Sequence, residues 1–441
     1  MVTAVELKKN NESFSLNKFE YLFPFVIIAL FYMHNVTSSS IAGYIGMACL
    51  LITVVIYNTR HLLIITALLT PNLMMLKLVT SGSSLMSIFV IAIFIKYIFE
   101  NKSFKCKLCL LLHVTFVLIT ITIYLDTSLI TAFIRSMSFL LMAMDIVFLK
   151  EEERGKYINS SVLRAYFFGT VLSVLIGIIY YSQMGLNLFS GYFAGIRNDR
   201  NYFSATFALC ICIGLFLMNL EKANMVYYGV GSMILLFGGL VSSSRTFMLS
   251  LIFVFGFYVL LPVSSKKVKI GILLVFVAIG AFCLFGNQFI RAYDRMLKRF
   301  QLDTMSDGSG RLPVWEYYLR KTVSSPIRFL FGNGSAMQYI EMGEVKLIEH
   351  NTIIQLFSTT GLLGSLTWIS SIAQIGKKLS VPCRIRIATL SIIPLLSVIF
   401  SFFMISSLYL FQFDFALFIA LVFMYSIRQE WSMIDSIRQS N

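Results

Sequence analysis

Apolar residues fill most of this chain in long stretches, and short polar segments separate them. A helix needs roughly 20 mostly apolar residues to cross the hydrocarbon layer of a membrane, and about fourteen windows approach that pattern. The pattern therefore predicts an all-α, polytopic integral membrane protein. The windows predicted as spans are 21–34, 41–57, 62–79, 85–99, 108–124, 129–149, 162–182, 202–220, 225–242, 246–262, 270–287, 351–374, 387–406 and 410–426.

Composition points to the same class. Hydrophobic residues make up 58% of the chain, charged residues make up 13%, and the mean hydropathy is +0.81, a balance far from that of a soluble domain. Residues 1–20 are polar and contain Lys8, Lys9 and Lys18, which argues against a cleaved signal peptide. We therefore expect the first span to stay in the membrane.

The distribution of Lys and Arg predicts the orientation, because these residues accumulate in cytoplasmic loops. If the spans alternate and both ends of the chain are cytoplasmic, the loops 35–40, 80–84 and 125–128 face outward, and they contain no Lys or Arg. We predict a multi-pass protein of the cytoplasmic (inner) membrane. Topology and contact with anionic membrane lipids explain the net charge of +15, so no nucleic-acid partner is expected. The basic clusters on the predicted inner side are Lys8/Lys9/Lys18, Lys102/Lys105/Lys107, Lys150/Arg154/Lys156, Lys266/Lys267/Lys269 and Lys377/Lys378/Arg384/Arg386.

Two outward segments are longer than the other connections, 183–201 and the large loop 288–350, and both contain arginine. Positive charge on the outer side needs a reason, and either structural ion pairing or an anionic ligand supplies one. The predicted organisation is residues 1–287 with the first eleven spans, residues 288–350 as a large periplasmic loop, and residues 351–441 with the last three spans and a cytoplasmic tail.

The large loop divides into three pieces. In 288–301, apolar and basic residues alternate at helical spacing, which predicts an amphipathic helix lying on the membrane. Next, Pro313 is suited to the first turn of a helix that carries Trp315, with Arg311 at its entrance. A polar stretch then leads to Glu349-His350-Asn351 at the mouth of the next span.

The order and spacing of these groups resemble the signature of the bacterial O-antigen polymerase (Wzy-type) and O-antigen ligase superfamily. Upstream, an outward Asn-containing segment and a Ser-Arg turn between two spans resemble the same family, and either Arg197 or Arg200 could be the arginine of that segment. The groups that carry the resemblance are Gly195-Ile196-Arg197-Asn198-Asp199-Arg200-Asn201, Ser243-Ser244-Arg245-Thr246, Arg311 with Trp315, Phe331-Gly332-Asn333-Gly334, His350-Asn351 and Gly361-Leu362-Leu363-Gly364.

The resemblance implies a membrane-embedded, GT-C-like glycosyltransferase that uses a lipid-linked sugar donor. A polyprenyl-diphosphate donor is already activated, so the reaction mainly requires stabilisation of the departing diphosphate. The guanidinium of arginine is permanently charged and binds phosphate oxygens in a fork. We therefore predict that Arg245 and Arg311 are catalytic. The residues predicted to bind the diphosphate or the glycan are Arg197, Arg200, Asn201, Arg135, Trp315 and Asn351.

His350 is the predicted base that takes a proton from the acceptor hydroxyl, because imidazole titrates near neutral pH. The helix dipole at its position favours the neutral ring, whereas adjacent Glu349 favours the charged ring, and the sequence leaves that contest open. No paired Asp-x-Asp lies on the outward side. We therefore expect a reaction that uses neither metal nor cofactor.

Structural explanations compete with each of these roles. Arg245 could cap a helix hairpin, Arg311 could pair with Glu316, and His350 could orient Asn351 or cap the helix. Arg197 and Arg200 could bind lipid phosphates nonspecifically. Arg135 lies within an apolar span, where it either lines the donor groove or extends to the outer surface. Asp145 and Asp414 also lie in or near spans and are assigned to helix-packing pairs or cavity walls.

The function predicted from the sequence is an O-antigen polymerase that transfers a growing glycan from undecaprenyl diphosphate onto a lipid-linked repeat unit, with inversion at the anomeric carbon. Its expected partners are those lipid-linked glycans, membrane lipids, a chain-length regulator and a flippase. One alternative is a ligase that uses lipid A–core as acceptor. A different class of alternative is a lipid-linked oligosaccharide flippase or transporter.

Overall fold

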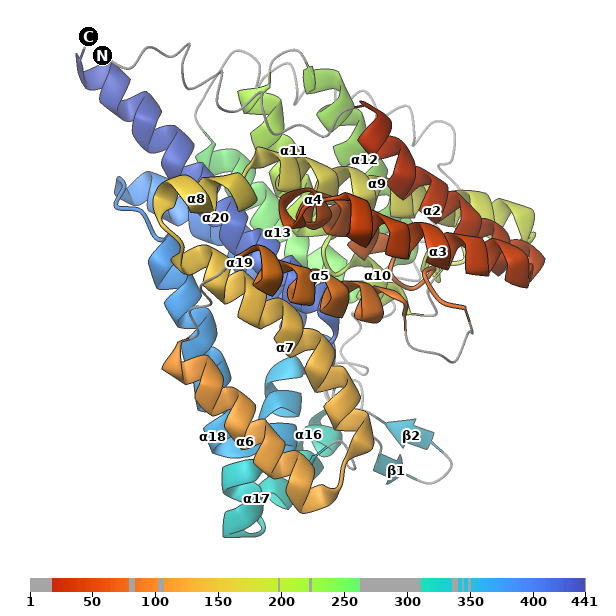
Figure 1. Cartoon of the computed structure of the whole chain (residues 1–441), viewed down its shortest axis with the longest axis vertical. Helices are drawn as coiled ribbons and strands as arrows, with labels where there is room; N and C mark the ends of the chain where they lie inside the picture. The colour runs from red at the N-terminus through yellow and green to blue at the C-terminus, as the bar shows by residue number, and fades with distance from the viewer. Residues whose placement is uncertain are drawn as a thin grey trace.

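The computed structural model describes residues 18–78, 84–101, 107–196, 199–221, 224–261, 311–334, 340–342, 345–347 and 350–440. Over these residues the protein is helical apart from one short antiparallel hairpin, β1 (Ile340–Met342) and β2 (Val345–Leu347), which projects from one end of the molecule (Figure 1). The hairpin is a local departure from the predicted all-α fold. Its strands alternate apolar and polar residues, with Glu341 opposite Lys346 in register, a pattern that suits paired strands.

The helices before the large loop follow the predicted spans closely in most cases. Their bounds are α2 (Lys18–Thr37), α3 (Ser40–Ile56), α4 (Thr59–Leu69), the 3₁₀ helix η1 (Thr70–Asn72), α5 (Met86–Glu100), α6 (Leu108–Tyr124), α7 (Thr127–Phe148), α8 (Glu151–Tyr157), α9 (Ser160–Gln183), α10 (Arg200–Ser204), α11 (Phe207–Leu220), α12 (Met225–Ser242) and α13 (Arg245–Leu260). The later helices are α16 (Arg311–Val323), α17 (Pro326–Phe331), α18 (Thr352–Leu379), α19 (Ile385–Phe402) and α20 (Phe411–Ser440).

Seven helices among the described residues are long and apolar enough to cross a membrane, and four further apolar helices are shorter. This supports the prediction of a polytopic membrane protein. The predicted span 270–287 and the predicted surface helix 288–301 lie outside the described residues. The predicted total of about fourteen spans therefore remains a prediction.

The predicted continuous span 62–79 is wrong. Helix α4 ends at Leu69, and the chain continues through η1, which contains Pro71. Proline has no N–H and its ring clashes with the preceding turn, so the α-helix stops before it. The side-chain amide of Asn72 then donates to the carbonyl of Gly169 in α9 (3.1 Å). The hydropathy of the window does not predict this hydrogen bond between helices.

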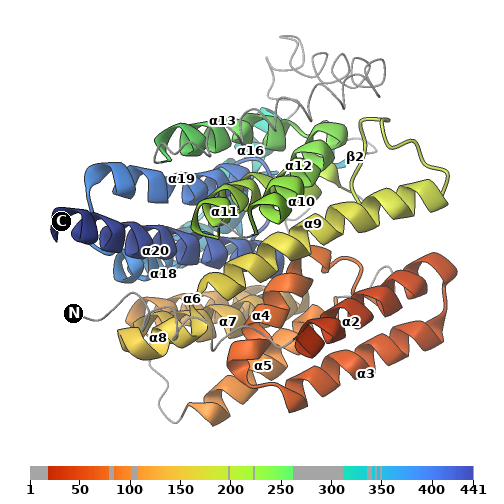
Figure 2. The same ribbon diagram turned by 90° about the horizontal axis from the view of Figure 1, so that it is seen from above.

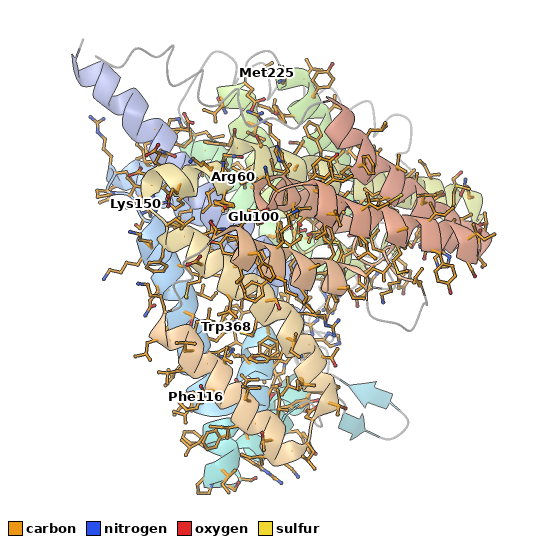
Figure 3. All side chains as sticks on the ribbon, in the orientation of Figure 1. Arg60, Glu100, Phe116, Lys150, Met225 and Trp368 are labelled. Atoms are coloured by element: carbon orange, nitrogen blue, oxygen red, sulfur yellow. The ribbon has the colours of Figure 1, made fainter. Side chains whose placement is uncertain are left out.

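Hydrogen bonds and an ion pair join helix ends at both predicted sides of the membrane. At the end predicted to be cytoplasmic, the Thr59 N–H donates to Glu100 (3.1 Å), and Arg164 pairs with Glu221 (2.6 Å). Arg60 and Glu100 accordingly lie close together in Figure 3. At the opposite end, the Tyr124 hydroxyl of α6 donates to the carbonyl of Gly332 (2.8 Å).

Helix α20 is enclosed by other helices over its membrane-length window, Phe411–Trp431. It contacts α7, α9, α18 and α19, and 94% of its membrane-length window is buried (Figure 2). Its polar residue Asp414 accepts a hydrogen bond from the Ser136 hydroxyl of α7 (2.6 Å). Asp145 likewise accepts from the Tyr97 hydroxyl of α5 (2.5 Å), so both buried carboxylates form pairs between packed helices.

Helix α18 is broken at Gly361, whose backbone has φ 67° and ψ −169°. The break frees the carbonyls of Ser358 and Thr359 from their helical partners. The turn after α17 occupies that place, because the N–H groups of Asn333 and Gly334 donate to these two carbonyls (2.7 and 3.1 Å). The Phe331-Gly332-Asn333-Gly334 segment, part of the family resemblance, therefore fills the break in α18 with its backbone. We call this segment the plug.

The same plug fixes α16 beside the start of α18. The Asn333 side chain donates to the Thr322 hydroxyl near the end of α16 (2.9 Å). Buried Val314 and Tyr318 of α16 pack against Ile354 in the first turn of α18. These contacts bring the first residue of α16 near the residue that precedes α18.

Candidate functional site

Four segments far apart in the sequence meet at the end of the molecule that is predicted to face outward. They are the start of α10, the turn between α12 and α13, the first residue of α16, and the residues just before α18. Each provides one polar or charged residue of the constellation described below: Asp199, Arg245, Arg311 and His350.

The start of α10 is tied to the turn between α12 and α13. Asp199 caps α10, because its carboxylate accepts from the N–H groups of Asn201 (2.7 Å) and Tyr202 (3.2 Å). The Ser244 hydroxyl donates to the Asn201 side-chain oxygen (3.0 Å). Asn201, predicted to bind substrate, therefore connects two loops that carry site residues.

Arg245 is the first residue of α13, and it does not serve as the cap. The Ser244 side chain caps this helix by accepting from the N–H of Phe247 (3.4 Å). Ser243 before it has a positive φ of 48°, an uncommon backbone conformation for a residue other than glycine. The tight turn places Arg245 at the helix mouth, where its charge acts on Arg311.

Arg311 begins α16 and is partly buried. Its guanidinium contacts the sulfur of Met404 (3.9 Å), while Glu316 pairs with Arg320 at 2.5 Å, so the proposed Arg311–Glu316 pair does not form. Burial and then the positive charge of Arg245 lower the pKa of Arg311, whereas Asp199 and Tyr202 raise it. Two guanidinium groups close enough to repel each other form a site that an anion would stabilise.

His350 lies next to this cation pair. Burial and then the charge of Arg311 lower its pKa below the ordinary value of 6.5, and Asp199 opposes that shift. The imidazole is therefore neutral near pH 7, as a general base must be. Glu349, the competing influence considered from the sequence, lies outside the described residues.

The helix-capping role considered for His350 belongs to its neighbour. The Asn351 side chain accepts from the N–H groups of Ile353 (3.0 Å) and Ile354 (3.1 Å), so Asn351 caps α18. His350 itself has a positive φ of 45°. A strained backbone at a polar residue is typical of functional sites.

Comparison with known protein families matches residues 230–369 to the O-antigen ligase family. The chain carries an O-antigen ligase family domain. The resemblance drawn from the sequence is thereby confirmed, and this domain contains Arg245, Arg311 and His350. It supports activity of the O-antigen ligase or polymerase type without distinguishing the two. No curated protein and no solved structure matches the chain.

The connection between α19 and α20, residues 403–410, also lies beside the O-antigen ligase domain. The sequence did not predict this contact. The Tyr202 hydroxyl donates to the carbonyl of Ser406 (2.5 Å), and the Thr352 hydroxyl donates to that of Ile405 (2.7 Å). Predicted spans covered most of this connection. The only sequence signal was the polar pair Ser406-Ser407, which is weak in a chain rich in buried serine.

Other predicted substrate-binding residues are placed differently. Arg200 is bound within its own loop, since its guanidinium donates to the carbonyl of Gly191 and lies over the Tyr192 ring (4.5 Å). Arg135 donates to the Ser87 hydroxyl of α5 (3.3 Å), and none of its described contacts reaches Arg311. Both roles remain predictions without geometric support.

Trp315 and Arg197 complete the predicted set. Trp315 is partly buried, one helical turn after Arg311, and residues four apart share a helix face, so it can flank the site. Arg197 lies outside the described residues. Within the described part of the chain, no group of three or more His, Cys, Asp or Glu side chains could hold a metal ion.

Proposed function

We propose that this protein is a glycosyltransferase that polymerises a surface polysaccharide of the O-antigen type. It would move a growing glycan from a polyprenyl diphosphate, undecaprenyl diphosphate in bacteria, onto a hydroxyl of a lipid-linked repeat unit. The observation that carries this proposal is the grouping of three residues from separate segments, in which the charge of Arg245 acts on Arg311 and the charge of Arg311 acts on His350.

In the proposed reaction, the donor diphosphate lies between the guanidinium groups of Arg245 and Arg311. The bond between the anomeric carbon and the diphosphate oxygen breaks, and the negative charge that develops on that oxygen is stabilised by the two cations. Neutral His350 accepts the proton of the attacking hydroxyl and later releases it to water. Attack from the face opposite the leaving group inverts the anomeric carbon, and the cations replace a metal ion.

A ligase that uses lipid A–core as acceptor is the second candidate, and the description of the matched family favours it. The donor chemistry is the same for both, so only the acceptor distinguishes them. Purified protein can be given two acceptors, a lipid-linked repeat unit and lipid A–core, in separate reactions that both contain the lipid-linked glycan donor. A polymerase extends the first in steps, whereas a ligase transfers glycan only to the second.

The proposed function is tested with purified protein, lipid-linked repeat units and EDTA. We expect a ladder of extended products from the wild type, and loss of at least about a hundredfold in rate for Arg245→Ala, Arg311→Ala and His350→Ala at unchanged protein abundance. Matched controls are Arg320→Ala, which lies on the exposed part of α16, and His61→Ala near the opposite end of the molecule.

Three results would count against the proposal. Elongation that requires added divalent metal would contradict the arginine mechanism. Normal ladders in all three variants would remove the site assignment. Translocation of lipid-linked oligosaccharide without any elongation would favour the transporter alternative.

A further inference from the structure

Asp199 is a charged residue at the site to which the proposed reaction assigns no role. One carboxylate oxygen, Oδ1, accepts from the N–H groups of Asn201 (2.7 Å) and Tyr202 (3.2 Å). Among the described residues, its second oxygen makes no hydrogen bond. The cap therefore holds the carboxylate in place and leaves one oxygen available to the surrounding charges.

Hydrogen bonds on both sides fix Asp199 between the segments that carry the arginines. On one side, Asn201 accepts from Ser244, the residue before Arg245 (3.0 Å). On the other side, Tyr202 donates to Ser406 (2.5 Å), in the same connection whose Met404 contacts Arg311 (3.9 Å). Asp199 is thus bound to two residues that are themselves bound to neighbouring loops.

The charges around the site show what this placement does. His350 experiences the positive charge of Arg311 from α16 and the negative charge of Asp199 from α10. Arg311 experiences Arg245 from α13, and Asp199 and Tyr202 from α10. Asp199 is therefore the described carboxylate that offsets the arginines at both groups.

We propose that Asp199 is a positioning residue for glycan transfer: its carboxylate, held by the α10 cap among the loops at the site, balances the charge of the two arginines beside His350 and weakens their hold on the diphosphate. The inference rests on the proposed function. The second effect follows because a fixed negative charge repels an incoming diphosphate and also the polyprenyl diphosphate product. Asp199 thus lowers the affinity for the donor, keeps His350 more basic and favours release of the product.

Asp199→Asn separates charge from structure, because asparagine is an equally good helix N-cap and keeps the oxygen that accepts from Asn201 and Tyr202. Without the charge, the pKa of His350 falls further, so the acid limb of the kcat profile moves to lower pH by about half a unit or more. The KM for the lipid-linked donor falls about threefold or more, and kcat falls with it, since a weaker base reacts more slowly and product leaves more slowly.

The control is Glu316→Gln, which removes a carboxylate of the same charge from the exposed face of α16, where it pairs with Arg320. It should leave both the acid limb and the donor KM unchanged. A second readout is independent of turnover: diethyl pyrocarbonate modifies neutral imidazole. The pH midpoint of His350 modification, taken as the difference from His350→Ala, should move down in Asp199→Asn.

The inference is overturned if Asp199→Asn retains the wild-type acid limb and modification midpoint. Equal loss of abundance in Asp199→Asn and Asp199→Ala, with an unmoved midpoint, would show a role confined to folding. These outcomes differ from failure of the proposed function, which would appear as unimpaired elongation in His350→Ala and Arg311→Ala.

Discussion

Positive φ angles occur at the predicted base, His350, and at Ser243, two residues before Arg245. Such a backbone costs about 1 to 3 kcal/mol for a residue other than glycine, and it persists only where surrounding contacts impose it. Here Ser244 caps α13 and Asn351 caps α18, so each strained residue is adjacent to a cap. The caps hold Arg245 and His350 at helix mouths, and Ser244 and Asn351 do the capping.

The ionisation of His350 predicts the pH dependence of glycan transfer. The base must be neutral, so activity is present above the pKa of His350 and is lost as the pH falls through it. Because burial and Arg311 lower that pKa, the acid limb of kcat should lie below pH 6.5. Rates measured between about pH 4.5 and pH 8 with saturating substrate give the midpoint. A midpoint above 6.5 would contradict the assignment of His350.

At the scale of elements, the broken helix α18 and the turn that fills it determine where the site forms. The chain approaches itself so closely there that only glycine fits. A Cβ at Gly332 would lie 2.3 Å from the carbonyl oxygen of Thr359, and one at Gly361 would lie 2.4 Å from the backbone of Leu330. Both glycines also have positive φ, 80° and 67°.

We therefore expect Gly332→Ala and Gly361→Ala to lower the free energy of unfolding by about 3 kcal/mol or more each, since backbone atoms cannot move aside as a flexible side chain can. The melting temperature in detergent should fall and chain elongation should fall with it. Gly155→Ala in α8 is the control, because a Cβ there meets nothing within 4 Å. Equal melting temperatures in all three variants would show that the plug does not hold α18.

At the scale of the whole molecule, the sequence predicted the helical membrane class, most helix positions and the family domain. Apolar windows predict these features because the residues of a span determine by themselves whether it can cross a membrane. The windows did not reveal the end of α4 at Leu69, although Pro71 was visible, because hydropathy alone does not distinguish a helix from a buried turn. The connection 403–410 was missed for the same reason.

The candidate site was predictable only in part. Arg245, Arg311 and His350 could be singled out because they stand in the order that the family resemblance supplies. Asp199 was in a quoted segment but received no role, since its relation to Arg311 and His350 depends on contacts between loops that are distant in sequence. The binding of the Arg200 guanidinium to Gly191 likewise depends on the fold of its own loop.

The central claim is that two guanidinium groups hold a lipid diphosphate beside a neutral imidazole. An experimental structure of the protein with bound polyprenyl diphosphate tests it most directly. We predict phosphate oxygens at about 2.7 to 2.9 Å from the guanidinium nitrogens of both Arg245 and Arg311, with His350 facing the terminal phosphate, where the sugar is attached in the donor. A diphosphate bound elsewhere, with either arginine turned away from it, would contradict the account.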